Sequence, residues 1–211
     1  MSTIISLLIF LYSVILHEIS HGWLADRLGD PTARLHKRLT LNPISHIDLW
    51  MSIVFPLILM LTGSPIIFGS AKPVPIDPYN LRHPRKDMGL IGLSGPITNL
   101  LIASFLALVI RFLPFSTPSW LVVGLIRGLQ INVVLAIFNL IPIPPLDGSR
   151  VLSAILPEKY ASALNSLERY GLFIIIFLLL FPSPFLSLQS IISKFAGMVL
   201  NILLPSPVTI I

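Results

Sequence analysis

The sequence predicts an all-α integral membrane protein with about five transmembrane helices and a membrane re-entrant segment after the first. Of the 211 residues, 55% are apolar and only 11% are charged, whereas soluble domains carry about 25% charged residues. The apolar residues gather in runs near the length of about 20 that spans a bilayer. Nineteen prolines predict broken helices or irregular loops at membrane depth. This composition argues against both a soluble enzyme and a disordered chain.

The numbers of charged residues and cysteines indicate which partners and which metal ligands are possible. The chain carries 14 Lys and Arg against 9 Asp and Glu, a net charge of +5. No nucleic-acid-binding motif accompanies this charge, so basic residues that set membrane topology are the better interpretation, with the lipid bilayer and not nucleic acid as partner. Because cysteine is absent, disulfides and thiolate metal sites are excluded.

The first predicted span covers residues 3–24. It lacks the basic start and the small-residue cleavage site of a signal peptide, and its length fits one membrane crossing. Its second half carries His17, Glu18 and His21. Ionisable side chains inside a span are costly and indicate function.

A polar loop at 25–48 separates this span from an interrupted apolar region. Residues 49–61 are apolar but too short to cross, and the stretch 66–77 is rich in β-formers and broken by prolines. Together they predict a re-entrant helix and β-hairpin that enters and leaves on one side, which requires protein or a cavity to receive its polar groups.

The remaining spans follow in order. Residues 88–110 form the cleanest one, with 23 residues and no charge, and 120–140 form the next. An amphipathic connector is expected at 149–170, and the segments 172–181 and 185–204 complete the set. We expect one membrane-embedded domain over residues 1–211, with a core at 3–155 and C-terminal membrane helices within 171–204.

The distribution of Lys and Arg predicts sidedness. Four lie in 25–48, four in 72–86 and three in 150–169, against one in the turn 111–119. Cytoplasmic loops carry the excess of basic residues. The first span therefore runs from outside to inside, and the span 120–140 also ends on the cytoplasmic side.

Residues 17–21 read His-Glu-Ile-Ser-His and match the H-E-x-x-H pattern of metalloproteases. Residues four apart lie on one helix face, so His17 and His21 can bind one zinc ion, with Glu18 beside them as general base. A catalytic zinc takes three protein ligands and leaves the fourth position to water. The motif therefore requires a third ligand from elsewhere in the chain.

The candidates for this third ligand are Asp147, His46 and Asp48. Asp147 follows the strongly apolar span 120–140, and Gly148 permits a tight turn there. His46 and Asp48 lie near the start of the re-entrant segment. The expected topology favours Asp147, because the first span ends on the same side. The other candidates are expected to be solvated or loop residues: Glu158, Glu168, His36 and His83.

At this point the chain resembles the site-2 proteases, a family of intramembrane zinc metalloproteases, over residues 12 to about 155. The resembling motifs are HEISHG at 17–22, NPISHID at 42–48, GSAKPVP at 69–75, GPITN at 95–99 and NLIPIPPLDG at 139–148. The second of them is similar to the small prokaryotic-type branch. The resemblance implies one Zn²⁺ per chain held by His17, His21 and Asp147, with Glu18 as the catalytic base.

The resemblance also implies a substrate and residues that bind it. Members of the family hydrolyse peptide bonds within or near transmembrane segments, so the expected partner is a transmembrane protein or membrane peptide. Asn139 matches an asparagine thought to hold the substrate backbone, although an interhelical hydrogen bond is an equal alternative. The stretch 68–76, with Gly69, Ser70 and Ala71, resembles the re-entrant β-hairpin of the family, whose edge could pair with an extended substrate. Asn99 is expected to bond between helices, and Gly92 and Gly95 to permit close helix contact.

Two departures from the family pattern concern regulation and the turn at Asp147. The family aspartate is usually followed by two glycines, whereas Ser149 follows Gly148 here. No PDZ or CBS module and no preceding transmembrane helix are expected, so the regulatory and substrate-gating modules of the family are also expected to be missing. The expected location is the cell membrane of a prokaryote, with the active site toward the cytoplasm.

A non-proteolytic zinc-binding membrane protein or metal transporter is the alternative. A transporter should space several carboxylates or histidines along a path through the membrane. This chain concentrates them at His17, Glu18, His21 and Asp147, which favours one catalytic site.

Overall fold

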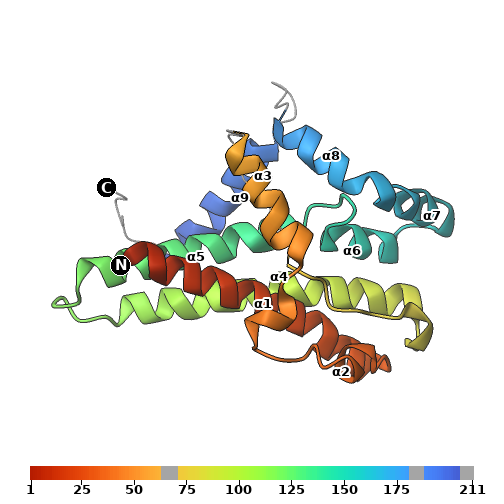
Figure 1. The fold of residues 1–211 in the computed structure, drawn as a ribbon, viewed down its shortest axis with the longest axis horizontal. Coiled ribbons are helices and arrows are strands. Elements are labelled where there is room, and N and C mark those ends of the chain that lie inside the picture. The colour runs from red at the N-terminus through yellow and green to blue at the C-terminus, as the bar shows by residue number, and fades with distance from the viewer. Residues whose placement is uncertain (63–70, 181–187, 205–211) are drawn as a thin grey trace.

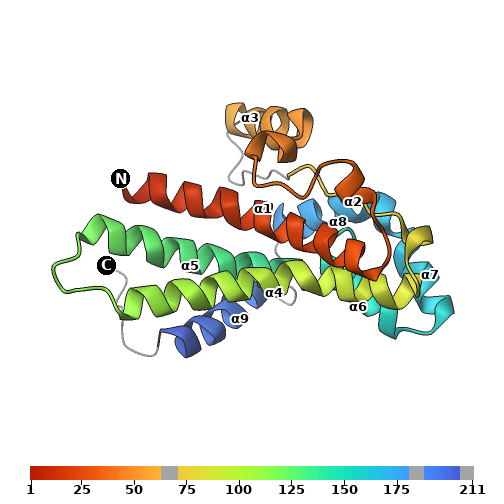
Figure 2. The ribbon, with the colours of Figure 1, turned by 90° about the horizontal axis from the view of Figure 1, so that it is seen from below.

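Three long helices form the centre of the protein. The computed structural model describes residues 1–62, 71–180 and 188–204, and within these ranges every regular element is a helix. Helices α1 (Ser2–Leu28), α4 (Pro84–Arg111) and α5 (Ser119–Asn139) lie side by side in both ribbon views (Figures 1 and 2). Each of the three contacts the other two, so they enclose a common core.

Shorter helices surround this bundle. Between α1 and α4 lie α2 (Thr32–Leu35), the 3-10 helix η1 (Pro43–His46), the π-helix η2 (Leu49–Val54), α3 (Phe55–Leu61) and the 3-10 helix η3 (Pro78–Asn80). After α5 come α6 (Asp147–Ile155), α7 (Glu158–Ser166), α8 (Glu168–Leu180) and α9 (Leu188–Leu203). Figure 1 shows α2, α6 and α7 at one end of the bundle and the turn between α4 and α5 at the other.

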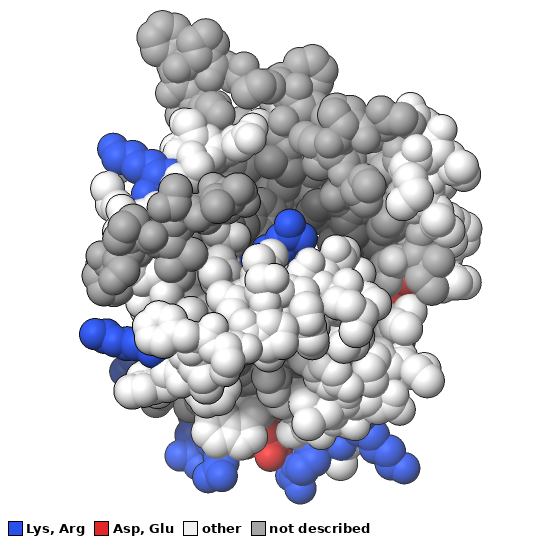
Figure 3. All heavy atoms as spheres, turned by 90° about the vertical axis from the view of Figure 1, so that its left-hand side faces the viewer, with Lys and Arg blue, Asp and Glu red and all other residues white. Residues whose placement is uncertain are grey.

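The helices agree with the expected membrane protein. Three described helices, α1, α4 and α5, are long and apolar enough to span a bilayer, and a fourth span results if α7 and α8, bent by 67°, count as one. Helix α9, with 16 residues, is shorter than a full span. The expected connector at 149–170 is divided among α6, α7 and the start of α8. Viewed from the end with the α4–α5 turn, most of the described surface is uncharged (Figure 3).

Two glycines allow α1 and α5 to approach closely. A Cβ atom on Gly124 would lie 2.9 Å from Cγ2 of Ile5, and one on Gly128 would lie 2.6 Å from Cδ1 of Ile9. Because the glycines are four residues apart, they form a groove on one face of α5 that receives the two isoleucines. This small-xxx-small pattern is a common means of close helix contact in membranes.

The described part of the segment 68–76, where a β-hairpin was expected, forms no strand. Residues 49–61 are helical as expected, but residues 71–77 form no strand, and 63–70 lie outside the described residues. Pro73 and Pro75 lack the N–H groups that a strand ladder needs. The N–H of Lys72 donates to the His46 carbonyl at 2.9 Å and that of Val74 to Oε2 of Glu18 at 2.9 Å. Within 72–75 the backbone therefore offers a substrate strand carbonyl acceptors but no unused N–H donor.

Asp30 holds together the loops that follow α1. Its carboxylate is buried and accepts hydrogen bonds from the Thr32 hydroxyl, from the Asp77 N–H at 2.7 Å and from the Asn80 amide at 2.9 Å. Burial acts to raise the pKa of this carboxyl, but the bonds from Thr32, Asn80 and Asp77 outweigh it and hold the pKa below its ordinary value of 3.8. The charged carboxylate thus ties the loop after α1 to the segment that leads into α4.

We expect acid to remove this contribution to stability. Because the folded-state pKa of Asp30 is lowered, its contribution is complete above the unfolded value near pH 3.8 and is lost as the pH falls through the folded value. Asp30→Asn should lower the unfolding free energy at pH 7 by about 1.5–3 kcal/mol, the worth of hydrogen bonds to a charged group, and flatten the loss below pH 4. Unfolding in detergent micelles, followed by circular dichroism from pH 3 to 7, measures both effects.

Asp26→Asn is the matched control, since it removes a carboxylate from a surface ion pair with Arg34. Such pairs contribute at most about 1 kcal/mol. Parallel pH profiles for the parent and Asp30→Asn would contradict this role of Asp30.

Candidate metal centre

Helix α1 presents two histidines to the interior of the bundle. His17 and His21 are one helical turn apart, and both are buried. Their Nε2 atoms lie 3.1 Å apart. The i, i+4 spacing seen in the sequence therefore places two nitrogen donors at one point.

Asp147 reaches the same point from the first residue of α6. Its Oδ2 atom lies 3.1 Å from Nε2 of His17 and 3.2 Å from Nε2 of His21. A tight turn after α5 delivers it: a Cβ on Gly148 would lie 2.2 Å from the Leu140 carbonyl oxygen, so only glycine fits at that position. The three side chains form the group of possible metal ligands found within the described residues.

The spacing of these donors fits a zinc ion. Zinc binds nitrogen and oxygen at about 2.0–2.2 Å in tetrahedral geometry, which places neighbouring ligands about 3.3 Å apart. The three donor atoms are 3.1–3.2 Å apart. Oδ2 of Asp147 is also buried without a hydrogen-bond partner among the described residues, which is costly for a carboxylate unless a cation compensates it.

The second ring nitrogen of each histidine is directed at an oxygen acceptor. Nδ1 of His17 lies 2.6 Å from Oδ1 of Asn99, and Nδ1 of His21 lies 2.7 Å from the Ile91 carbonyl oxygen. Both acceptors favour the proton on Nδ1, which leaves the lone pair of each Nε2 directed toward the centre. Such outer partners orient metal-binding histidines and select their tautomer.

The bond to His17 continues as a chain through three helices. The amide of Asn99 on α4 donates to Oδ1 of Asn132 on α5 at 3.0 Å, and the amide of Asn132 donates to Oγ of Ser13 on α1 at 2.8 Å. Asn99 and Asn132 are completely buried. The expected interhelical bond of Asn99 is confirmed. Asn132 was missed, although an asparagine in the middle of an apolar span was the signal that could have identified it.

Glu18 lies next to His17 and is held by the segment before α4. Its Oε2 accepts the Val74 N–H at 2.9 Å. That segment is fixed in turn, because the Arg38 guanidinium donates to the Lys72 carbonyl at 2.8 Å. The general base expected from the sequence therefore has one carboxylate oxygen engaged and a defined position.

None of the other described histidine and carboxylate candidates joins this ligand group. His46 shares a hydrogen bond through Nε2 with the Thr40 carbonyl oxygen at 2.8 Å, and Asp48 accepts the Trp50 N–H at 3.0 Å. The side chain of Asn139 donates within its own helix, to the Leu135 carbonyl at 3.0 Å. Glu158 pairs with Arg85. The side chains of Glu168, His36 and His83 are exposed, and Ala71 is half-buried. Gly69 and Ser70 lie outside the described residues.

Gly95 on α4 leaves the space that the His17 ring occupies. A Cβ at position 95 would lie 2.4–2.7 Å from three ring atoms of His17, so alanine must displace the ring. We expect Gly95→Ala to reduce zinc occupancy and to lower activity about a hundredfold, the cost of a displacement near 1 Å. Metal analysis of the purified protein and a cleavage assay measure these effects.

Gly197→Ala provides the control for Gly95→Ala. A Cβ at Gly197 on α9 meets no atom within 4 Å, so this variant should keep the zinc content and activity of the parent. Normal zinc content in Gly95→Ala would show that α4 can move away from His17.

Comparison with known proteins agrees with this centre. "Putative zinc metalloprotease YwhC" of Bacillus subtilis is 35% identical over 180 residues, covering 82% of this chain and 77% of that protein. "Putative zinc metalloprotease Rip2" of Mycobacterium tuberculosis is 30% identical over 176 residues, covering 82% of this chain and 66% of that protein. "Zinc metalloprotease MJ0392" of Methanocaldococcus jannaschii is 28% identical over 148 residues, covering 70% of this chain and 33% of that protein.

A family profile gives the same assignment, while no solved structure matches the chain. The profile of peptidase family M50 matches residues 121–182, from the start of α5 through α8. This range includes Asp147, and the similarity to YwhC extends over most of the chain. The resemblance to the site-2 proteases is thus confirmed: the chain belongs to peptidase family M50.

Proposed function

We propose that this protein is an intramembrane zinc metalloendopeptidase that hydrolyses peptide bonds within or near transmembrane segments of membrane proteins. The observation that carries the proposal is the convergence of His17, His21 and Asp147 at zinc spacing beside Glu18. Both histidines belong to a helix long and apolar enough to cross a membrane. Membership of family M50 and the names of its relatives support the metalloprotease class.

The ligands proposed for one Zn²⁺ per chain are Nε2 of His17, Nε2 of His21 and Oδ2 of Asp147. A zinc ion held by these three residues would lower the pKa of a bound water to about 7 and would polarise the scissile carbonyl. Glu18 accepts a proton from the attacking water and returns it to the leaving nitrogen, so the C–N bond breaks and a carboxylate and an amine are formed. The Val74 N–H holds the Glu18 carboxylate in place for both transfers.

The substrate-binding residues are proposed from their position in the chain and from the family resemblance. Asn139 lies at the end of α5, a short turn before Asp147, where its amide could hold an unwound substrate backbone. An extended substrate is proposed to pair at Gly69, Ser70 and Ala71 on the family resemblance of the GSAKPVP motif at 69–75 alone. A helical substrate must unwind first, since its carbonyls are engaged in i→i−4 bonds.

The proposed topology keeps five spans and a re-entrant segment at 49–76 in the cell membrane of a prokaryote. The basic loops lie near α2, α6 and α7, at the end of the bundle opposite the α4–α5 turn (Figure 1). Under the positive-inside rule this end faces the cytoplasm. Because Asp147 lies at the start of α6, the proposed orientation puts the centre toward the cytoplasmic side.

Cleavage by the purified protein in liposomes tests the proposal. We expect about one zinc per chain, and cuts mapped by mass spectrometry within or near the apolar span of a single-span reporter peptide. A chelator should stop the reaction and added zinc should restore it. Zinc-loaded protein that cuts none of a panel of such peptides would contradict the proposal and favour a non-proteolytic zinc protein.

A further inference from the structure

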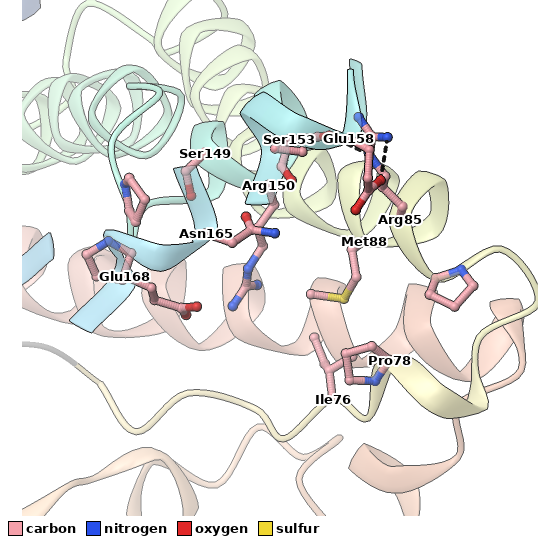
Figure 4. Close-up of a pocket in the computed structure, with 14 residues that line it drawn as sticks. Ile76, Pro78, Arg85, Met88, Ser149, Arg150, Ser153, Glu158, Asn165 and Glu168 are labelled. Atoms are coloured by element: carbon pink, nitrogen blue, oxygen red, sulfur yellow. Dashed lines mark hydrogen bonds and ion pairs between the residues drawn. The ribbon is translucent and has the colours of Figure 1, made fainter. Parts of the chain in front are cut away.

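A cavity of about 550 Å³ opens beside the metal centre, at the end of the bundle where α6 and α7 lie. This volume is within the range of about 300–1,000 Å³ typical of ligand sites. Ile76, Pro78 and Met88 form an apolar wall (Figure 4). The polar lining includes Ser149, Asn165, Glu158 and Glu168 together with two arginines. The cavity can therefore receive a short peptide with both apolar side chains and a polar backbone.

Arg150 connects this cavity with the metal centre. Its Nη1 lies 3.8 Å from Oδ1 of Asp147, the carboxylate oxygen other than the one directed at His17 and His21. At 3.8 Å this contact is longer than a hydrogen bond, and the side chain is 33% exposed. The donors of the Arg150 guanidinium therefore remain available to a ligand in the cavity.

The other arginine of the cavity is already engaged. Arg85 donates to the Ser153 carbonyl at 2.8 Å and to Glu158 at 3.0 Å. The stem of Arg150 packs against α4, because a Cβ on Gly92 would lie 3.1 Å from the Cβ and 3.7 Å from the Cδ of Arg150. Figure 4 shows the Arg150 side chain extending into the space between Glu168, at the start of α8, and Met88 on α4.

We propose that this cavity binds the N-terminal product peptide and that Arg150 binds its new carboxylate, an inference that rests on the proposed function. Hydrolysis creates a carboxylate beside Asp147, and a guanidinium pairs with a carboxylate through two parallel hydrogen bonds. The carboxylate of Asp147 lies between the Arg150 guanidinium and the ring of His17. The cavity wall then holds the last apolar side chains of the product.

Equilibrium binding of two product-like peptides tests this assignment. The probes are a fluorescein-labelled Leu-Ala-Leu-Ala peptide with a free C-terminal carboxylate and the same peptide ending in an amide. They are titrated by fluorescence anisotropy against the purified full chain, zinc-loaded and chelated. The chelated protein isolates the contribution of Arg150 from any direct contact between carboxylate and zinc.

The parent should bind the carboxylate about tenfold more tightly than the amide in the chelated state, as expected for one charged hydrogen-bonded pair. Arg150→Gln should reduce this ratio to about one, and Arg150→Lys, which keeps a cation, should give an intermediate ratio. Arg111→Gln, at the exposed far end of α4, should keep the parent ratio. Arg150→Lys also serves if Arg150→Gln does not fold, because loss of the bidentate geometry must lower the ratio.

Equal binding of the two peptides by the chelated parent, or an unchanged ratio in the Arg150 variants, overturns the inference. A residue that only held Asp147 in place would instead lower the zinc content of Arg150→Gln and leave the chelated ratio unchanged. Reporter cleavage by the parent is measured alongside. Its absence counts against the proposed protease, whereas an Arg150-independent ratio in a cleaving parent counts against the carboxylate site alone.

Discussion

Glu18→Gln is expected to leave zinc bound and to lower the rate of peptide cleavage by about 10²–10⁴-fold, the usual contribution of a general base. The glutamine side chain has the same shape, and its carbonyl oxygen can still accept the Val74 N–H that Oε2 of Glu18 accepts. It cannot accept a proton from water at neutral pH. Zinc content and initial rates in liposomes, measured on the same preparations, separate catalysis from metal binding.

Asp26→Asn is the control for this change, since it converts a carboxylate to an amide on the same helix, in a surface ion pair with Arg34. Its rate should match that of the parent. If Glu18→Gln cleaves as fast as the parent, Glu18 is not the base. If it instead loses zinc, Glu18 contributes to metal binding.

Asp147→Ala should lose both zinc and activity. Only the two histidines of α1 then remain of the proposed ligand group, whereas a catalytic zinc takes three protein ligands. We expect zinc affinity to fall by more than about a hundredfold, the upper range for loss of an outer-shell partner. Dialysis against graded zinc concentrations, followed by metal analysis, measures the change.

His46→Ala and Asp48→Ala are the matched comparisons, because sequence reasoning left both residues open as the third ligand. His46 contacts the Thr40 carbonyl oxygen, and Asp48 accepts the Trp50 N–H. Each variant should therefore retain zinc. Stoichiometric zinc in Asp147→Ala, with zinc lost in either of the others, would transfer the third ligand to the loop before α3.

The sequence predicted the central helices well because their signal is local. The spans expected at 3–24, 88–110 and 120–140 correspond to α1, α4 and α5, and each is long enough for composition alone to identify it. The described part of the β-like stretch, residues 71–77, forms no strand, and β-rich composition does not reveal which groups the backbone N–H donors contact. In the structure the N–H groups of Lys72 and Val74 are taken by groups distant in sequence.

In the candidate site, too, local features could be predicted from the sequence and contacts between distant segments could not. The spacing of His17 and His21 fixes their relation on one helix, so it could be predicted without a fold. That Asp147 meets them depends on α4 packing against both α1 and α6, which only the topology and the family resemblance suggested. Asn132 carried no motif, and its significance depends on contacts between helices that the sequence does not contain. Arg150 lies three residues after Asp147 on α6, but the cavity beside it depends on how α6, α7 and α8 pack.

The division of the metal centre between α1 and α6 has a consequence for synthesis. The two histidines enter the membrane with the first helix, whereas Asp147 follows only after α4 and α5. A growing chain therefore carries an incomplete site until most of the bundle has been inserted. Under the proposed function, this order of the ligands keeps the nascent chain from forming the three-ligand zinc site until α6 has been made.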